Sequence, residues 1–289
     1  MRSTHSYNLA VERVQTVLFW TGALALCGAL VAILSYLTVG AVGFLGHHDL
    51  FGVLFNARWA PTDGQYGMGL FFLGSAVVAG LALLLVVPLG LGLAVWGQAN
   101  LQPRGRERLG VYLTALSAVP SVVWGWWGLT AVVPLLRTLT GGPGYSLMAG
   151  GVVVGVMLFP TFAQLTLQAL CEVPESWVEG SWALGASSDQ TLLGIILPAA
   201  AEGIRRALWI ALARALGETI AVQMVVGGYA GRFWGVMAPG ATVTSQLLTD
   251  LPLLPPGTVG HGALDLMAIL LVVVMGLLTR WAGRRPGWR

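Results

Sequence analysis

Six long apolar stretches, separated by shorter polar segments, set the pattern of this chain. They cover residues 15–38, 68–97, 109–136, 146–170, 204–228 and 263–282. A helix needs about 20 apolar residues to cross the hydrocarbon core of a bilayer, and each stretch reaches that length. The pattern therefore predicts an all-α, polytopic membrane protein with about six transmembrane helices.

The composition fits a chain whose surface faces lipid. Of its 289 residues, 56% are hydrophobic and only 9% are charged, and the mean hydropathy is +0.78. A soluble domain carries about 25% charged residues because its surface faces water. Membrane lipid is therefore the expected environment of this protein, with polar loops on either side of the bilayer.

All 15 basic residues are arginines, and the absence of lysine excludes several functions. A Walker-type phosphate-binding loop requires a lysine, so the chain is not expected to hydrolyse ATP itself. Schiff-base and pyridoxal phosphate chemistry require one too, and we expect no cofactor. The arginines cluster between apolar stretches, which sets membrane orientation and does not suit a nucleic acid. No Ser/His/Asp grouping, metal motif or carboxylate pair lies within the stretches, so a non-catalytic protein is expected.

Counting arginines predicts the orientation, because cytoplasmic loops carry an excess of positive charge. With both termini in the cytoplasm, the inner side holds Arg2, Arg13, Arg104, Arg106, Arg108, Arg205, Arg206, Arg280, Arg284, Arg285 and Arg289. The outer side then holds only Arg58, Arg137 and Arg232. The excess of 11 over 3 predicts cytoplasmic termini and a cytoplasmic segment over residues 171–203.

The inner segment 171–203 has the features of two short helices joined by a turn. Pro174 suits the first position of a helix, Gly185 is a natural left-handed stop, and Pro198 is expected to end the second helix. Two capping boxes fit the pattern, in which a serine is followed three residues later by Glu or Gln. They are Ser176 with Glu179 and Ser187 with Gln190.

The same segment carries acidic and aromatic side chains against the positive-inside trend. Its acids are Glu172, Glu175, Glu179 and Asp189, and its large apolar side chains are Trp177, Val178 and Trp182. An exposed helix pair of this composition is suited to docking a protein partner. An interfacial helix lying on the membrane surface fits the composition equally well, and the residues alone leave both interpretations open.

A pair of opposite charges lies within the fifth apolar stretch. Arg214 and Glu218 are four residues apart, so a continuous helix would place them on one face, where they can pair. An unpaired charge at that depth costs about 2.5–3.5 kcal/mol or more, so both are expected to face the protein interior or a water-filled path. The arginine suits an oxyanion, because its planar fork binds phosphate-like oxygens bidentately. A self-neutralised pair that only fixes helix packing is the alternative.

Pro120 and Gly125 are expected to interrupt the third stretch near its middle. Such a break would free backbone groups that a path or a binding site can use. A packing kink has the same signature. Thr219, next to Glu218, and Ser121, next to Pro120, complete the residues that we expect along a translocation path.

The inner segment resembles a known loop. Glu179-Gly180-Ser181-Trp182-Ala183-Leu184-Gly185, followed by Ile196-Leu197-Pro198, is similar to the EAA loop of ABC importer permeases, with Gly180 and Ser181 in place of its two alanines. In that family the loop inserts into a groove on a cytoplasmic ATPase. The resemblance implies that ATP hydrolysis belongs to a partner chain. It assigns the coupling contact to Glu179, Gly180, Ser181, Ala183, Leu184, Gly185, Leu197 and Pro198.

Other segments resemble the permeases of phosphate importers, the PstC and PstA subunits. The run Arg-Ala-Leu-Gly-Glu-Thr-Ile-Ala-Val, from Arg214 to Val222, is similar to their signature, and the run from Pro120 to Leu129 agrees with it. Two further segments resemble PstC more closely than PstA. They are Trp59-Ala60-Pro61 with Tyr66-Gly67, and the run from Pro239 to Ser245. The resemblance implies a type I ABC importer permease fold in a bacterial plasma membrane, with inorganic phosphate as the substrate.

The same resemblance implies the partners and the domain organisation. A second, PstA-like permease, two ATP-binding cassette subunits and an extracytoplasmic phosphate-binding protein are expected. Residues 1–66 would form an N-terminal helix and outer loop, 67–282 the permease domain and 283–289 a cytoplasmic basic tail. The alternatives are a permease for another oxyanion, such as molybdate or sulfate, and a secondary transporter without an ATPase. The lack of a convincing internal repeat argues against the latter.

Overall fold

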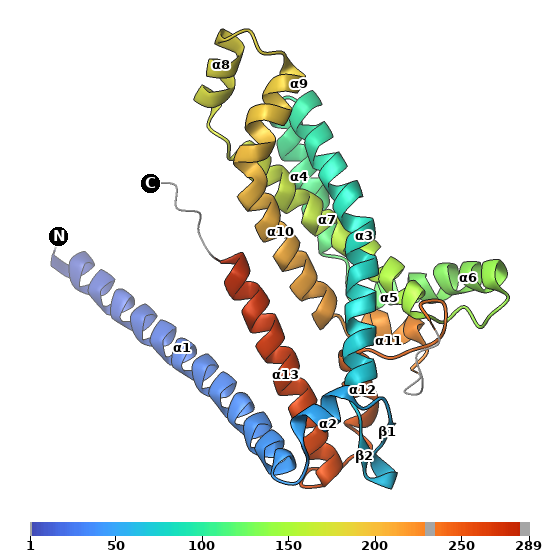
Figure 1. Ribbon diagram of the computed structural model, residues 1–289. Helices are drawn as coiled ribbons and strands as arrows, with labels where there is room; N and C mark the ends of the chain where they lie inside the picture. The colour runs from blue at the N-terminus through green and yellow to red at the C-terminus, as the bar shows by residue number, and fades with distance from the viewer. Residues whose placement is uncertain (1, 229–234, 284–289) are drawn as a thin grey trace.

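The structure, a computed structural model, describes residues 2–228 and 235–283, with side chains from residue 15 onward (Figure 1). Most of this chain is α-helical. The helices are α1 (Arg2–Leu45), α2 (Leu50–Phe55), α3 (Gly69–Asn100), α4 (Pro103–Ser117), α5 (Ser121–Trp127), α6 (Val133–Thr140), α7 (Leu147–Cys171), α8 (Glu175–Ala183), α9 (Ser188–Thr191), α10 (Leu197–Gly217), α11 (Ile220–Val226), α12 (Val243–Asp250) and α13 (Val259–Ala282). The strands β1 (Trp59–Ala60) and β2 (Gln65–Tyr66) form a short antiparallel hairpin.

The elements gather at two ends of the helical bundle. Helices α8 and α9 project at one end, whereas α2, the β-hairpin and α12 lie together at the opposite end (Figure 1). The first turn of α1 and the last turn of α13 point away from the α12 end. Of the arginines in that count, the side chains of Arg2 and Arg13 and all of Arg232, Arg284, Arg285 and Arg289 lie outside the described residues.

Within the described residues, five helical segments are long and apolar enough to cross a membrane. They are Gln15–Leu45, Gly69–Asn100, Ser121–Thr140, Leu147–Cys171 and Val259–Ala282. The segments Ser188–Gly217 and Ile220–Val226, bent by 60° at a short break, make a sixth if the pair forms one span. The prediction of about six transmembrane helices is therefore confirmed.

The third span differs from its prediction. The sequence predicts one helix over 109–136, but α4 ends at Ser117 and the segment of spanning length is Ser121–Thr140. Pro120 causes the break, because it donates no N–H and drives the preceding residue out of the α region. Gly125 does not interrupt the span. It is buried inside α5, where a Cβ would lie 3.0 Å from the Cα of Ala221, so it allows α5 to pack closely on α11.

Within the described residues, four prolines lie inside continuous helices, and a π-helical turn precedes two of them, Pro134 and Pro198, but not Pro88 of α3 or Pro160 of α7. The turns cover Gly128–Val132, before Pro134, and Leu192–Ile196, before Pro198. Proline removes one hydrogen bond and its ring clashes with the carbonyl four residues earlier, and the wider π turn relieves both effects. The prediction that Pro198 ends a helix is therefore wrong, since the helix continues through it to Gly217.

The core lies where α3, α7 and α10 pack together. Small residues at the crossings allow close approach, as is common between membrane helices. On α7, Gly151 faces Leu81 and Gly155 faces Leu85 of α3, and a Cβ at either glycine would overlap the facing leucine. On α10, the buried alanines of the core cluster are Ala207, Ala211 and Ala215.

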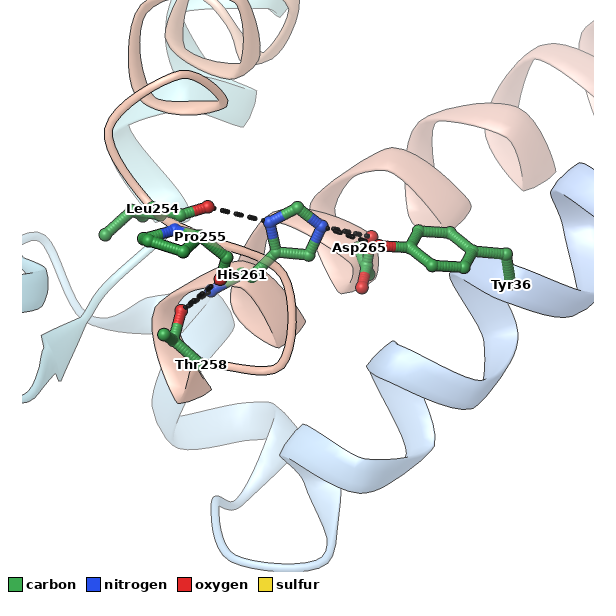
Figure 2. Close-up of polar contacts among 6 residues, drawn as sticks. All are labelled: Tyr36, Leu254, Pro255, Thr258, His261 and Asp265. Carbon is green, nitrogen blue, oxygen red and sulfur yellow. Dashed lines mark hydrogen bonds and ion pairs between the residues drawn. The ribbon is translucent and has the colours of Figure 1, made fainter.

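A polar cluster joins α1 to α13 near the α12 end of the bundle (Figure 2). The Nδ1 of His261 lies 2.9 Å from the carbonyl of Leu254, and its Nε2 lies 3.0 Å from the hydroxyl of Tyr36. Because a carbonyl only accepts, Nδ1 carries the proton and Nε2 of a neutral ring accepts from the tyrosine. The Asp265 carboxylate lies 3.9 Å from Nε2, and the side chains of both His261 and Asp265 are buried. Gly40 of α1 packs directly on Asp265.

The contact at Gly40 predicts a local loss of stability on substitution. In Gly40→Ala, the new Cβ would overlap the Asp265 carboxylate. Overpacking of this kind typically costs about 1–3 kcal/mol. The matched control is Gly28→Ala on the same helix, where nothing lies within 4 Å. Unfolding of the purified protein in detergent should show a loss only for Gly40→Ala, and equal stability of the two variants would contradict the contact.

Candidate functional site

The turn between α8 and α9 is built from a helix stop and a helix cap. Gly185 has a φ of +84°, and its N–H donates to the carbonyl of Trp182 over 2.9 Å, while the N–H of Ala186 donates to Ser181 over 3.2 Å. These two bonds form a Schellman motif, which satisfies the last carbonyls of α8. The capping box of Ser187 with Gln190 is present at the start of α9. Both local predictions are confirmed.

Two details of the sequence prediction for the start of α8 are wrong. Helix α8 begins at Glu175, so Pro174 lies at the cap position, one residue before its predicted place. Ser176 then lies within the first turn and forms no capping box with Glu179. Pro174 favours the earlier start, because its fixed φ of −57° already suits the entry into a helix.

The α8–α9 elbow, residues 174–191, presents apolar side chains to its surroundings. Leu184, at the turn, is 91% exposed, and Trp182 is 54% exposed. The hydroxyls of Ser181 and Thr191, 2.9 Å apart, link the two helices. Among the predicted coupling residues, Glu179, Gly180, Ala183, Leu184 and Gly185 are exposed on the elbow. Leu197 and Pro198 lie instead in the first turn of α10, where Leu197 packs against a buried cluster.

The helix carrying Arg214 ends at Gly217, before it reaches Glu218. Glu218 has an extended backbone, with φ −71° and ψ 125°, and the next helix starts at Ile220 at an angle of 60°. The two charges therefore do not share a helix face, and they form no ion pair within 4.0 Å. Among the described residues, the ion pairs between an arginine and a carboxylate are Arg58–Asp63 and Arg205–Glu202. The predicted pairing of Arg214 with Glu218 is wrong.

The break gives the two charged residues different roles. Oε1 of Glu218 accepts from the N–H of Ala221 over 3.2 Å and so caps α11, and the Glu218 carbonyl accepts from the Thr244 hydroxyl over 2.8 Å. Arg214 is exposed, and its Nη1 donates to the hydroxyl of Thr161 on α7 over 2.8 Å. Within the described residues, this is the one side-chain hydrogen bond of the guanidinium.

Polar residues around the break extend the site beyond the prediction. The hydroxyl of Thr219 donates to the carbonyl of Gly217 over 3.3 Å. On α11, Nε2 of Gln223 donates to the Thr249 hydroxyl over 3.1 Å, and its buried Oε1 has no partner within the described residues. Gln223 is the one strongly polar side chain in the run from Ile220 to Val226, a signal that sequence reasoning could have used.

Comparison with known proteins decides the family. Residues 86–285 match the family described as "Binding-protein-dependent transport system inner membrane component". The chain belongs to this permease family. It is also 34% identical over 265 residues to the probable ABC transporter permease protein YqgH of Bacillus subtilis (strain 168), covering 87% of this chain and 83% of that protein.

Phosphate permeases are among the relatives of this ABC permease. It is 30% identical to the phosphate transport system permease protein PstC 1 of Mycobacterium tuberculosis, covering 93% of this chain and 94% of that protein. It is 28% identical to PstC of Haemophilus influenzae, with 76% of each covered. The predicted resemblance to the PstC family is confirmed.

Solved structures show that the fold is that of a type I ABC importer permease. The chain resembles an inward-facing structure of the MetNI methionine ABC transporter at 21% identity, covering 78% of this chain and 100% of that chain, with a TM-score of 0.53. It resembles a bacterial alginate ABC transporter at 15% identity, covering 91% and 92%, with a TM-score of 0.58. Membership of the permease family, and not these structures, makes the protein a multi-pass, non-catalytic permease subunit, and the family works with a second permease, ATPase subunits and a binding protein.

Pro120 and Ser121 of this permease lie at the start of α5, and the structure does not bring them into contact with Arg214 or Glu218. Pro120 is the exposed cap residue and Ser121 the half-buried first residue of the helix. Their link to the break is indirect, because α5 packs on α11 through Gly125 and Ala221. Any role of Pro120 and Ser121 in a path therefore stays a prediction.

Proposed function

We propose that this permease is the PstC-type subunit of an ATP-driven importer of inorganic phosphate. The observation that carries the proposal is the exposed guanidinium of Arg214, beside a broken transmembrane helix and held by one hydroxyl. An arginine with free N–H groups at that depth suits a phosphate oxyanion, which it binds through paired hydrogen bonds. The PstC relatives support the same substrate.

Glu218 favours phosphate over sulfate within this proposal. Its Oε1 is occupied by the N–H of Ala221, whereas no hydrogen bond to its Oε2 occurs within the described residues. At neutral pH, phosphate carries at least one hydroxyl that can donate to a carboxylate, and sulfate carries none. A site built to bind a substrate hydroxyl rejects analogues that lack it, because its own polar group is left unpaired. Repulsion between the carboxylate and a fully ionised oxyanion acts in the same direction.

We place the α8–α9 elbow and both termini in the cytoplasm, following the arginine count. The elbow then reaches the ATPase subunits of the complex, and the exposed Leu184 and Trp182 supply an apolar contact surface. The α2, β-hairpin and α12 end faces outward, toward the phosphate-binding protein. ATP hydrolysis belongs to the partner chains, since this chain has no lysine for a Walker loop. A PstA-like permease completes the path.

The substrate is tested with the complete transporter in proteoliposomes. The permease is assembled with its partner permease, ATPase subunits and binding protein, and ATP hydrolysis and uptake are measured with phosphate, sulfate and molybdate. Hydrolysis and uptake stimulated only by phosphate are expected. Stimulation by molybdate or sulfate instead would contradict phosphate as the substrate but would keep the permease role. Uptake without any associated ATPase would contradict the proposal that ATP hydrolysis drives transport.

A further inference from the structure

A row of polar side chains runs along one face of α7, inward from Arg214. Thr161, Gln164 and Gln168 are three and seven residues apart, so they share a helix face and span about 10 Å along it. Gln168 is exposed and the other two are half-buried, whereas Phe162 on the adjoining face is fully buried. These three residues form what we name the α7 track.

The α7 track opens into a groove between α7 and α4. The groove holds about 520 Å³, and its polar lining includes Gln164, Gln168 and Thr114, with the opposite charges of Arg106 and Glu107 at its inner end. At the other end of the α7 track, the Thr161 hydroxyl accepts from Arg214 over 2.8 Å. Within the described part of the chain, neither glutamine amide forms a side-chain hydrogen bond.

An unpartnered amide is unfavourable at Gln164, which lies seven residues, about 10 Å, from the inner end of α7. Moving an amide from water into an apolar medium without a hydrogen bond costs several kcal/mol, and the hydrocarbon core offers no partner. Gln164, with Gln168 on the same face nearer the inner end of α7, therefore indicates water, or a polar solute, along that face. A face turned to lipid would carry the apolar residues found on the exposed part of α1.

We propose that Thr161, Gln164 and Gln168 line the inner half of the translocation path and pass the anion from Arg214 to the inner end of α7. The proposal rests on the proposed function, because it takes Arg214 as the anion contact. Amides and hydroxyls both donate and accept, so they bind the charged oxygens of phosphate and its hydroxyl. Being neutral, they hold the anion weakly. Conduction requires such weak, repeated sites, and a row of arginines would trap the anion.

Single cysteines test whether the α7 track faces water. In a Cys27→Ser, Cys171→Ser background, cysteine replaces Gln164, Gln168 or, as the control, Leu165, which packs against the core cluster. The complete transporter in inside-out vesicles is treated with 2-sulfonatoethyl methanethiosulfonate, a small anionic thiol reagent. We expect Gln164→Cys and Gln168→Cys to react at least about tenfold faster than Leu165→Cys, since the reaction requires a hydrated thiolate. We expect phosphate to slow both reactions.

A second set of variants tests whether the α7 track carries the anion. Gln164→Leu and Gln168→Leu should each reduce phosphate uptake about tenfold, the effect of losing one hydrogen bond to an ion. Association with the ATPase should remain, and Gln164→Asn should retain more uptake than Gln164→Leu. If these cysteines did not react in a transporter that takes up phosphate, the proposal that the α7 track lines the path would be overturned, and the proposed function would stand. If the unsubstituted complex took up no phosphate, the proposal that phosphate is its substrate would be overturned instead. The cysteine labelling would still decide whether the α7 track faces water.

Discussion

Arg214→Gln is expected to reduce phosphate uptake by about two orders of magnitude. A hydrogen bond to an ion contributes about 1.5–3 kcal/mol, and a bidentate contact that also loses its charge reaches the upper end of that range or beyond. Folding should be little affected, because Arg214 is exposed and its one described side-chain bond goes to Thr161. Uptake by proteoliposomes measures the loss, and ATPase co-purification confirms that the complex still assembles.

Two control variants separate the charge of Arg214 from its position. Arg214→Lys keeps the charge but loses the planar fork, so uptake should fall between the values for the original chain and Arg214→Gln. Thr161→Val removes the hydroxyl that holds Nη1 and should weaken uptake less than Arg214→Gln does. Wild-type uptake by Arg214→Gln at normal expression would show that the arginine is not on the path.

Glu218→Gln should act on selectivity more than on folding. The amide oxygen of glutamine can still accept from the N–H of Ala221, so the cap on α11 is kept. The acceptor for the phosphate hydroxyl is weakened and the repulsion of a fully ionised anion is removed. Sulfate should therefore stimulate ATP hydrolysis more in this variant than in the original chain. Unchanged phosphate-to-sulfate selectivity would leave Glu218 with the capping role alone.

The helix break at Glu218 shows where sequence reasoning reached its limit. A four-residue spacing places two side chains on one face only if the helix between them is continuous. Gly217 and Thr219 flank Glu218, and glycine has a low helix propensity. The sequence around Glu218 therefore does contain a local indication that the helix ends there. Glu218 then finds its hydrogen bonds at the start of the next helix. The depth of both charges in the membrane stays a prediction, whereas the predicted pairing geometry was wrong.

Local signals were correct at the turn between α8 and α9, although not at the start of α8. The left-handed Gly185 and the capping box at Ser187 depend on residues within a few positions of each other, and both are present. Pro198 failed as a helix stop because a π turn can accommodate proline, and no residue type marks such a turn in advance. Thr161 was missed for another reason. It lies 53 residues from Arg214, and a single hydroxyl in an apolar stretch does not reveal a contact at that separation.

Leu184→Asp is expected to weaken the association of this permease with its ATPase subunits about 100-fold. Leu184 is 91% exposed at the tip of the α8–α9 elbow, so the substitution leaves the internal packing of the chain unchanged. Burying a leucine in a partner stabilises a contact by about 1.5–3 kcal/mol, and burying a carboxylate in its place adds a desolvation cost. Co-purification at graded detergent and salt concentrations measures the loss.

The matched control is Leu253→Asp, which changes another strongly exposed leucine, in the loop that follows α12 at the opposite end of the bundle. It should keep the ATPase bound, because the loop faces away from the elbow. If Leu184→Asp retained full association and phosphate-stimulated hydrolysis, the elbow could not be the ATPase contact. The exposed leucine would then be explained by an elbow that lies on the membrane surface, the alternative that its composition left open.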